Sequence, residues 1–147
     1  MKTIFLMLVC SIEICGALYA ATPPVSVKKA FEAKFTTATN VKWGKEGTTE
    51  WEATFSFEGD KLSANFAEDG KWLETESAIK SKAVPSSVTK AIQTDFPGYK
   101  TIERQSIEKP DSKEFIYEIH IKKDKEVVKL QYSTDGKQLT KSVKTEK

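Results

Sequence analysis

Hydrophobic residues along the chain follow two alternating spacings, one typical of helices and one typical of strands. Apolar residues recur at i, i+3, i+4 and i+8 from Val27 to Phe35, and the same spacing returns 61 positions later from Val88 to Phe96. This spacing places the apolar side chains on one face of an amphipathic helix. We therefore predict two helices, with Ser26 and Ser86 as their N-terminal caps.

The spacing changes to two after each predicted helix, which indicates strands with one apolar and one polar face. Four apolar residues alternate with mostly polar ones after the first helix, and four more do so 64 positions later. A further alternating segment follows each of these, at an offset of 66 positions. The apolar residues are Trp51, Ala53, Phe55 and Phe57, then Leu62, Ala64 and Phe66, and in the second half Phe115, Tyr117, Ile119 and Ile121, then Val128, Leu130 and Tyr132.

A short phrase occurs twice, as FAEDGKW at 66–72 and as YSTDGKQ at 132–138. Asp-Gly between alternating segments is typical of a two-residue type I′ hairpin turn, which needs positive φ at both central positions. We predict such turns at Asp69-Gly70 and Asp135-Gly136, and this register pairs Ala67 with Trp72. A calcium loop, the alternative interpretation, needs a run of alternating oxygen ligands that neither phrase has.

These elements predict an α+β fold of two tandem repeats, each a helix followed by an antiparallel meander, with the helices packed on one face of the sheet. Gly59-Asp60 should turn the first meander, and Lys123–Glu126 should form a longer turn in the second. We assign residues 21–80 to the first repeat and 81–147 to the second. The two should form one compact unit, because about 60 residues alone bury a thin core.

The first 20 residues have the layout of a secretory signal peptide. Met1-Lys2 supplies a positive charge, Ile4–Cys10 an apolar run, and Ala20 a small residue at the expected cleavage point. A short buried helix is the alternative. Cys10 and Cys15 both fall in this segment, so the mature chain would have no thiol for a disulfide, a nucleophile or a zinc site. We expect a periplasmic or secreted protein without a membrane span.

The charges exclude one class of partner. The formal net charge is +2, with 8 lysines and 10 acids in residues 22–80 and 14 basic and 10 acidic residues in 81–147. Almost all basic residues are lysines scattered among Glu and Asp, whereas a nucleic-acid binder usually has a clustered basic face with arginines. We therefore expect no nucleic-acid partner.

Three segments carry a family resemblance. VPSSVTKAIQTDFPGYKTI at 84–102 resembles the proline-to-PGY helix segment of the PepSY-like, beta-lactamase-inhibitor-like proteins exported by Gram-negative bacteria. NVKWGKEGTTEWEATFSF at 40–57 and ANFAEDGKWLETE at 64–76 are similar to the strand segments of that family. The resemblance implies a tandem α+β fold with helices on one face of an antiparallel sheet. It also implies binding rather than catalysis, with an inhibitory or regulatory role as one form of that binding, and it brings no established functional residues.

The sequence offers little for catalysis. His120 is the one histidine, and Glu118 lies two residues away on the same predicted face, so hydrolase chemistry is a remote alternative. The commoner interpretation is a surface histidine beside an ordinary acid. With one histidine, no cysteine after residue 20 and no phosphate-binding glycine loop, we expect neither a metal nor a cofactor.

The polar face of the predicted sheet is the remaining candidate site. The helices should leave it open, and an open face with aromatic anchors suits an exported protein or peptide partner. The predicted partner-binding residues are Trp72, Asn65, Ser63, Thr54, Glu52, Glu118, His120 and Gln131, and Lys129 shares their face. We therefore predict an exported, non-catalytic binding module.

Trp72 is the anchor in this hypothesis, because the predicted register places it on the polar face beside Ser63 and Asn65. Trp43 and Trp51 share the parity of core residues and are predicted to pack. Three alternatives remain: the linker 78–84 covers Trp72; the face is simply wet, or is covered by a second copy in a weak homodimer; or a small molecule or peptide binds in the cleft between the repeats.

Overall fold

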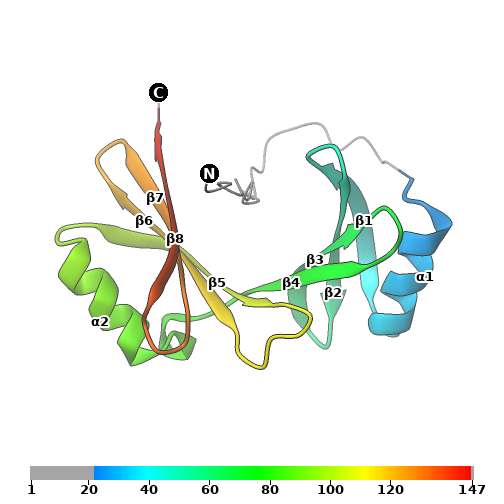
Figure 1. Ribbon diagram of the computed structural model, residues 1–147, viewed down its shortest axis with the longest axis horizontal. Helices are drawn as coiled ribbons and strands as arrows, with labels where there is room; N and C mark the ends of the chain where they lie inside the picture. Colours follow the sequence, from blue (N-terminus) through cyan, green and yellow to red (C-terminus); the bar gives the residue numbers. More distant parts are fainter. Residues whose placement is uncertain (1–21, 147) are drawn as a thin grey trace, which may run out of the picture.

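The computed structural model describes residues 22–146, and Figure 1 shows its elements in chain order. The predicted signal peptide and its cleavage after Ala20 lie outside these residues. The first half contains helix α1 (Val25–Lys34) and strands β1 (Thr39–Glu46), β2 (Glu50–Phe57), β3 (Asp60–Ala67) and β4 (Trp72–Ala78). The second half contains a 3-10 turn η1 (Ser81–Ala83), helix α2 (Ser86–Asp95) and strands β5 (Lys100–Glu108), β6 (Ile116–Lys123), β7 (Glu126–Tyr132) and β8 (Gln138–Thr145).

The eight strands form one antiparallel sheet in the order β1 to β8, so every strand pairs with its neighbours in sequence. The halves join where β4 pairs with β5, and there Ser77 lies opposite Ser106. The same row continues to Leu62 on one side and to Tyr117 on the other. Because Leu62 packs below α1 and Tyr117 packs below α2, both helices cover one face of the sheet. This confirms the α+β class and the placement of the helices.

Each helix packs on its own hydrophobic core. The core under α1 is aromatic: the Phe31 ring lies 4.9 Å from that of Phe55 and 5.2 Å from that of Trp43, both edge to face. Trp51 is 7% exposed in the same core, so the predicted packing of Trp43 and Trp51 is confirmed. The core under α2 is mainly aliphatic and consists of Val88, Ile119, Ile121, Val128, Leu130 and Tyr132.

The Asp-Gly turns differ from the prediction in one respect that changes the register. Gly70 N–H donates to the Ala67 carbonyl and Ala67 N–H donates to the Lys71 carbonyl, so the loop has three residues, 68–70, and is followed by a bulge. Trp72 therefore lies opposite Phe66, not Ala67. The repeated phrase at 132–138 folds in the same way. Positive φ is confirmed at Gly70 (94°) and Gly136 (87°), but neither aspartate has it, so the type I′ prediction is wrong.

The other predicted turns are also displaced. The β2–β3 turn is Glu58-Gly59, both at positive φ, rather than Gly59-Asp60. The shift keeps the same residues on each face, because partners move by two positions. The turn between β6 and β7 is Asp124-Lys125, which has two residues and is not longer than its counterpart. The extra residues of the second half lie instead between β5 and β6, so β2 and β6 correspond at an offset of 66, not 64.

The serines at the helix starts bind the turns instead of capping the helices. Neither helix has a side-chain cap, so the prediction for Ser26 and Ser86 is wrong. Ser26 Oγ donates to the Glu68 carbonyl at 3.0 Å, and Ser87 Oγ donates to the Thr134 carbonyl at 2.6 Å. Each accepting carbonyl belongs to an Asp-Gly loop. Each loop therefore lies directly against the first turn of its helix.

Alanine at Gly70 or Gly136 should destabilise the protein by about 2 kcal/mol or more, because it combines backbone strain with a steric clash. A Cβ on Gly70 would lie 2.7 Å from the Ser26 carbonyl oxygen, and one on Gly136 would lie 2.8 Å from that of Ser87. Thermal and denaturant unfolding of the mature protein measure both losses.

Two other glycines provide matched controls. Gly59 has positive φ but open space around its Cβ position, so G59A should cost only about 1 kcal/mol. Gly44 has neither constraint, so G44A should cost least. Equal losses for G59A, G70A and G136A would show that the contact between turn and helix contributes nothing.

Candidate functional site

The candidate site is the face of the sheet opposite the helices, which we call the inner face. The sheet curves, so that α1 and α2 lie on its outer side and the inner face lines the space between the halves (Figure 1). Seven of the eight predicted partner-binding residues lie at strand positions whose side chains point to the inner face. These are Glu52, Thr54, Ser63, Asn65, Glu118, His120 and Gln131.

The inner face is less open than the sequence predicts. Of those seven residues only Thr54 is exposed and Glu52 is half-buried, whereas the remaining five are buried. The prediction of an open face is wrong for these five side chains. In the second half these side chains are buried because charged and amide groups on neighbouring strands bond to one another.

Glu118 is the centre of this polar network and is 1% exposed. One carboxylate oxygen, Oε1, accepts from Lys129 Nζ at 2.9 Å and lies 3.0 Å from His120 Nε2. The other oxygen, Oε2, accepts from Gln131 Nε2 at 2.9 Å. Glu118, Lys129 and Gln131 share neighbouring rows of β6 and β7, so the register of the sheet brings these groups together.

Hydrogen bonding fixes the charge of Glu118. Burial alone would raise the pKa of its carboxyl, but the hydrogen bond from His120, the charge of Lys129 and the hydrogen bonds from Gln131 and Lys129 together lower it. Glu118 is therefore ionised at neutral pH. A buried, paired carboxylate of this kind holds its neighbours in fixed positions.

His120 bridges two carboxylates. Its Nε2 faces Glu118 and its Nδ1 lies 2.8 Å from Glu103 Oε2 on β5. The two contacts hold the imidazole ring between β5 and β6. Such a histidine orients its neighbours and has no free nitrogen to act as a base.

Glu76 on β4 is the opposite case. It is 5% exposed, and burial together with the charges of Glu118 and Glu74 raises its pKa to about 8, against a smaller opposing effect of Lys129. Sequence reasoning missed this residue because β4 has no apolar alternation that would show which of its side chains face the core. The same holds for Gln105 on β5, whose Oε1 is buried without a hydrogen-bond partner.

The first half of the inner face is acidic. Asn65 Nδ2 donates to Glu46 Oε2 at 2.5 Å. The pKa of Glu52 is raised by burial and by the charge of Glu46, and the pKa of Glu50 is raised by burial and by Glu46 and Glu74. Carboxylates that raise one another's pKa create a negative potential on this part of the face.

Trp72, the predicted anchor, does not belong to the inner face. The bulge before it places its ring on the helix side, where it packs against the core under α1. The Lys34 ammonium lies 3.5 Å from the ring centroid, and the indole Nε1 donates to Thr75 Oγ1 at 3.0 Å. The position of Lys34 in the second half is taken by Asp95, which cannot make a cation–π contact. Gln138 stands at the corresponding position of the repeated phrase.

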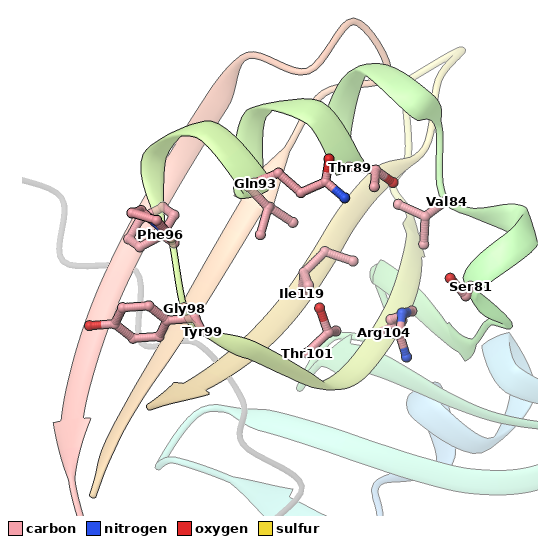
Figure 2. A pocket seen from close by; sticks show the side chains of 12 residues that line it. Ser81, Val84, Thr89, Gln93, Phe96, Gly98, Tyr99, Thr101, Arg104 and Ile119 are labelled. Carbon is pink, nitrogen blue, oxygen red and sulfur yellow. The ribbon is translucent and has the colours of Figure 1, made fainter. Parts of the chain in front are cut away.

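Two cavities lie near these residues. The first, of about 560 Å³, opens beside the junction of the halves and is lined by Asn40, Lys42, Thr54, Phe55, Ser56, Lys61, Leu62, Ser63, Glu76, Ala78 and Gln105. We call it the junction cavity. The second, of about 340 Å³, lies between α2 and the sheet within the second half, and Figure 2 shows Thr101, Arg104 and Ile119 among its lining residues.

The fold and the inner face define a class of protein. The family described as beta-lactamase-inhibitor-like and PepSY-like matches residues 49–140. The chain belongs to this family. None of the helices in residues 22–146 is long and apolar enough to cross a membrane. No curated protein matches the chain.

Solved structures share the fold at low sequence identity. A DUF2874 family protein from Bacteroides ovatus is 21% identical, with a TM-score of 0.74 over 84% of this chain and 89% of the other. A BLIP-like protein from Bacteroides fragilis is 20% identical, with a TM-score of 0.72 over 86% and 90% of the two chains. A protein from Bacteroides eggerthii described as "putative periplasmic" is 19% identical, with a TM-score of 0.76 over 85% and 91%.

Replacing Trp72 with Gln should destabilise the protein by about 1–3 kcal/mol, because the ring packs on a core and receives Lys34. Gln138→Ala at the exposed counterpart is the control and should change stability little. Unfolding experiments compare the two. An unchanged melting temperature for W72Q would mean that Trp72 does not pack on the core and is a surface residue.

Glu76→Gln should stabilise the protein in a pH-dependent way. A raised pKa means that the protonated carboxyl favours folding; this contribution is complete below pH 4.5 and is lost as the pH rises toward 8. The variant should therefore be more stable than the wild type by on the order of a few kcal/mol near pH 8, and by much less near pH 5. Thermal unfolding at both pH values, with exposed Glu32→Gln as control, tests this. The same difference at both pH values would contradict it.

Proposed function

We propose that the protein is an exported, non-catalytic binding module that holds a protein or peptide partner on the inner face of its sheet. The observation that carries this proposal is the network around Glu118, in which His120, Lys129 and Gln131 are held by mutual hydrogen bonds. Groups fixed before binding lose little conformational freedom on contact with a partner, which favours recognition.

The same network supports a binding role over the hydrolase alternative. Both ring nitrogens of His120 face carboxylates, and within residues 22–146 no hydroxyl that could act as a nucleophile bonds to the ring. The family description names likeness to an inhibitor, which supports binding of another protein and an inhibitory or regulatory role. The identity of that protein depends on the inner-face side chains rather than on the fold.

We also propose that residues 21–80 and 81–147 are tandem copies of one unit. Ser26 with Gly70 and Ser87 with Gly136 make equivalent contacts. The pairs β2–β3 and β3–β4 correspond to β6–β7 and β7–β8 at one offset of 66 positions. Removal of the signal peptide after Ala20 would release the mature chain into the periplasm or the exterior, as a monomer or weak homodimer. The likeness to a periplasmic relative agrees with this location.

A second candidate function is ligand binding between the repeats. The junction cavity favours it, because Gln105 of the second half closes a space otherwise lined by strands of the first. A small molecule or a peptide would occupy this cavity.

Partner capture should depend on the inner face. Immobilised mature protein is exposed to the periplasmic and medium fractions of the source bacterium, and bound proteins are identified by mass spectrometry. We expect Glu52→Lys to reduce capture of a specific protein by about tenfold or more, because it reverses a charge on the inner face. Glu32→Lys makes the same change on the exposed side of α1 and should leave capture intact.

Two results would overturn the proposal. Capture that is unaffected by both Glu52→Lys and Thr54→Arg would place the binding surface elsewhere. No captured protein, together with a small molecule released from the purified mature chain, would favour the ligand-binding candidate.

A further inference from the structure

We infer that the junction cavity binds a primary ammonium group, such as the lysine side chain of a partner, between Glu76 and Gln105. This inference rests on the proposed function and specifies the partner chemistry at one point of the inner face. Glu76 of β4 and Gln105 of β5 both line the cavity, and both are at least nine-tenths buried.

The unsatisfied carbonyl of Gln105 is the first observation. The side chain is 4% exposed, and its Nε2 donates to Glu103 Oε1 at 3.0 Å. That bond fixes the orientation of the amide and leaves Oε1 as an acceptor with no partner. Buried acceptors are nearly always paired, because an unpaired one costs stability. A ligand that brings an N–H donor into the cavity would remove this cost.

The charges around Glu76 are the second observation. Glu118, Glu74 and Glu46 act on it with negative charge, and among residues 22–146 the charge of Lys129 opposes them. Within residues 22–146, no hydrogen bond or ion pair to the Glu76 side chain is found. An added cation would therefore meet a net negative potential and an available carboxylate.

The shape of the acceptor set favours an ammonium group over other ligands. Glu76, Gln105, Thr54 and Ser63 line the cavity and carry oxygens that accept hydrogen bonds, and an ammonium group presents three N–H donors. An anion would face a carboxylate and an unpaired carbonyl. No group of three metal-binding side chains occurs among the residues that the structure describes.

Two lysines also line the cavity, but neither pairs with its acceptor groups. Lys42 and Lys61 are exposed, and neither is among the charges that act on Glu76. Glu76 and Gln105, by contrast, are buried. A bound ligand would therefore reach Glu76 by passing between exposed side chains.

Binding should be linked to proton release. Glu76 has a pKa of about 8, so it is mostly protonated at pH 7, and an ammonium group pairs best with the ionised carboxylate. A ligand that binds at pH 7 should therefore displace up to about one proton from the wild-type protein. Glu118, Glu74, Glu46 and Lys129 are the groups that set this pKa, and Glu118 stays ionised throughout this range.

The test uses Nα-acetyl-lysine N-methylamide as the probe and the norleucine analogue as its uncharged match. The probe is titrated at millimolar concentrations into 15N-labelled mature protein, and amide shifts are followed along β3, β4 and β5. Calorimetry in buffers of different ionisation enthalpy measures the protons released. We expect the lysine probe to shift the amides that surround the cavity, and the norleucine analogue to bind about tenfold more weakly or worse.

Variants decide whether the two named groups are responsible. Glu76→Gln should weaken binding by about tenfold or more and abolish proton release. Gln105→Met, which removes the acceptor and keeps the length of the side chain, should also weaken binding. Glu32→Gln removes an exposed carboxylate of α1 that does not line the cavity and should retain both signals.

Three results would overturn the inference: no shift around the cavity, equal binding of the norleucine analogue, or unchanged binding by Glu76→Gln. The proposed function fails by a different result, namely protein capture that is independent of Glu52 and Thr54. Capture that depends on the inner face, without lysine binding in the cavity, would refute only the ammonium site.

Discussion

The contact between each Asp-Gly loop and the first turn of a helix is the constraint on which the rest of the structure depends. Gly70 lies against the Ser26 carbonyl and Gly136 against that of Ser87, at distances that admit no Cβ. The serine hydroxyls bind the same two loops. Each helix is thereby held across β3–β4 or β7–β8, with its apolar side on the sheet. Since both contacts lie on one face, the opposite face receives no helix.

The inner face carries many carboxylates and no covering helix, so these carboxylates need partners on the face itself. In the second half Glu118 has such partners, because its carboxylate contacts three side chains and its pKa is lowered. Near the junction partners are missing among residues 22–146: the pKa of Glu76 is raised, and Gln105 keeps an unpaired oxygen. The inner face thus combines a preorganised region with a region that would gain from a cationic partner, and the binding proposals depend on this difference.

Much of this fold could be predicted from periodicity. The helices, the strands with clear apolar alternation and the use of one face follow from the positions of Phe31, Phe55 and Ile119. The prediction was wrong where a single extra residue changes the strand register. A bulge after Asn65 places Trp72 on the helix side of the sheet. The acidic part of the site could not be predicted, since β4 and β5 lack an apolar alternation that would place Glu76 beside Gln105. The pairing of Glu118 with His120 was visible from their spacing, but the roles of Glu103 and Lys129 required the sheet.

The central claim is that the inner face holds an electrostatically unsatisfied carboxyl where the two halves meet. Carbon-13 NMR of the glutamate side-chain carboxyls in the mature protein, followed across a pH titration, measures this directly. We predict that one resonance, assigned to Glu76 through its absence in Glu76→Gln, titrates with a midpoint near 8. A midpoint close to the ordinary glutamate value of 4.5 would contradict it, because Glu76 would then be either solvated or already paired.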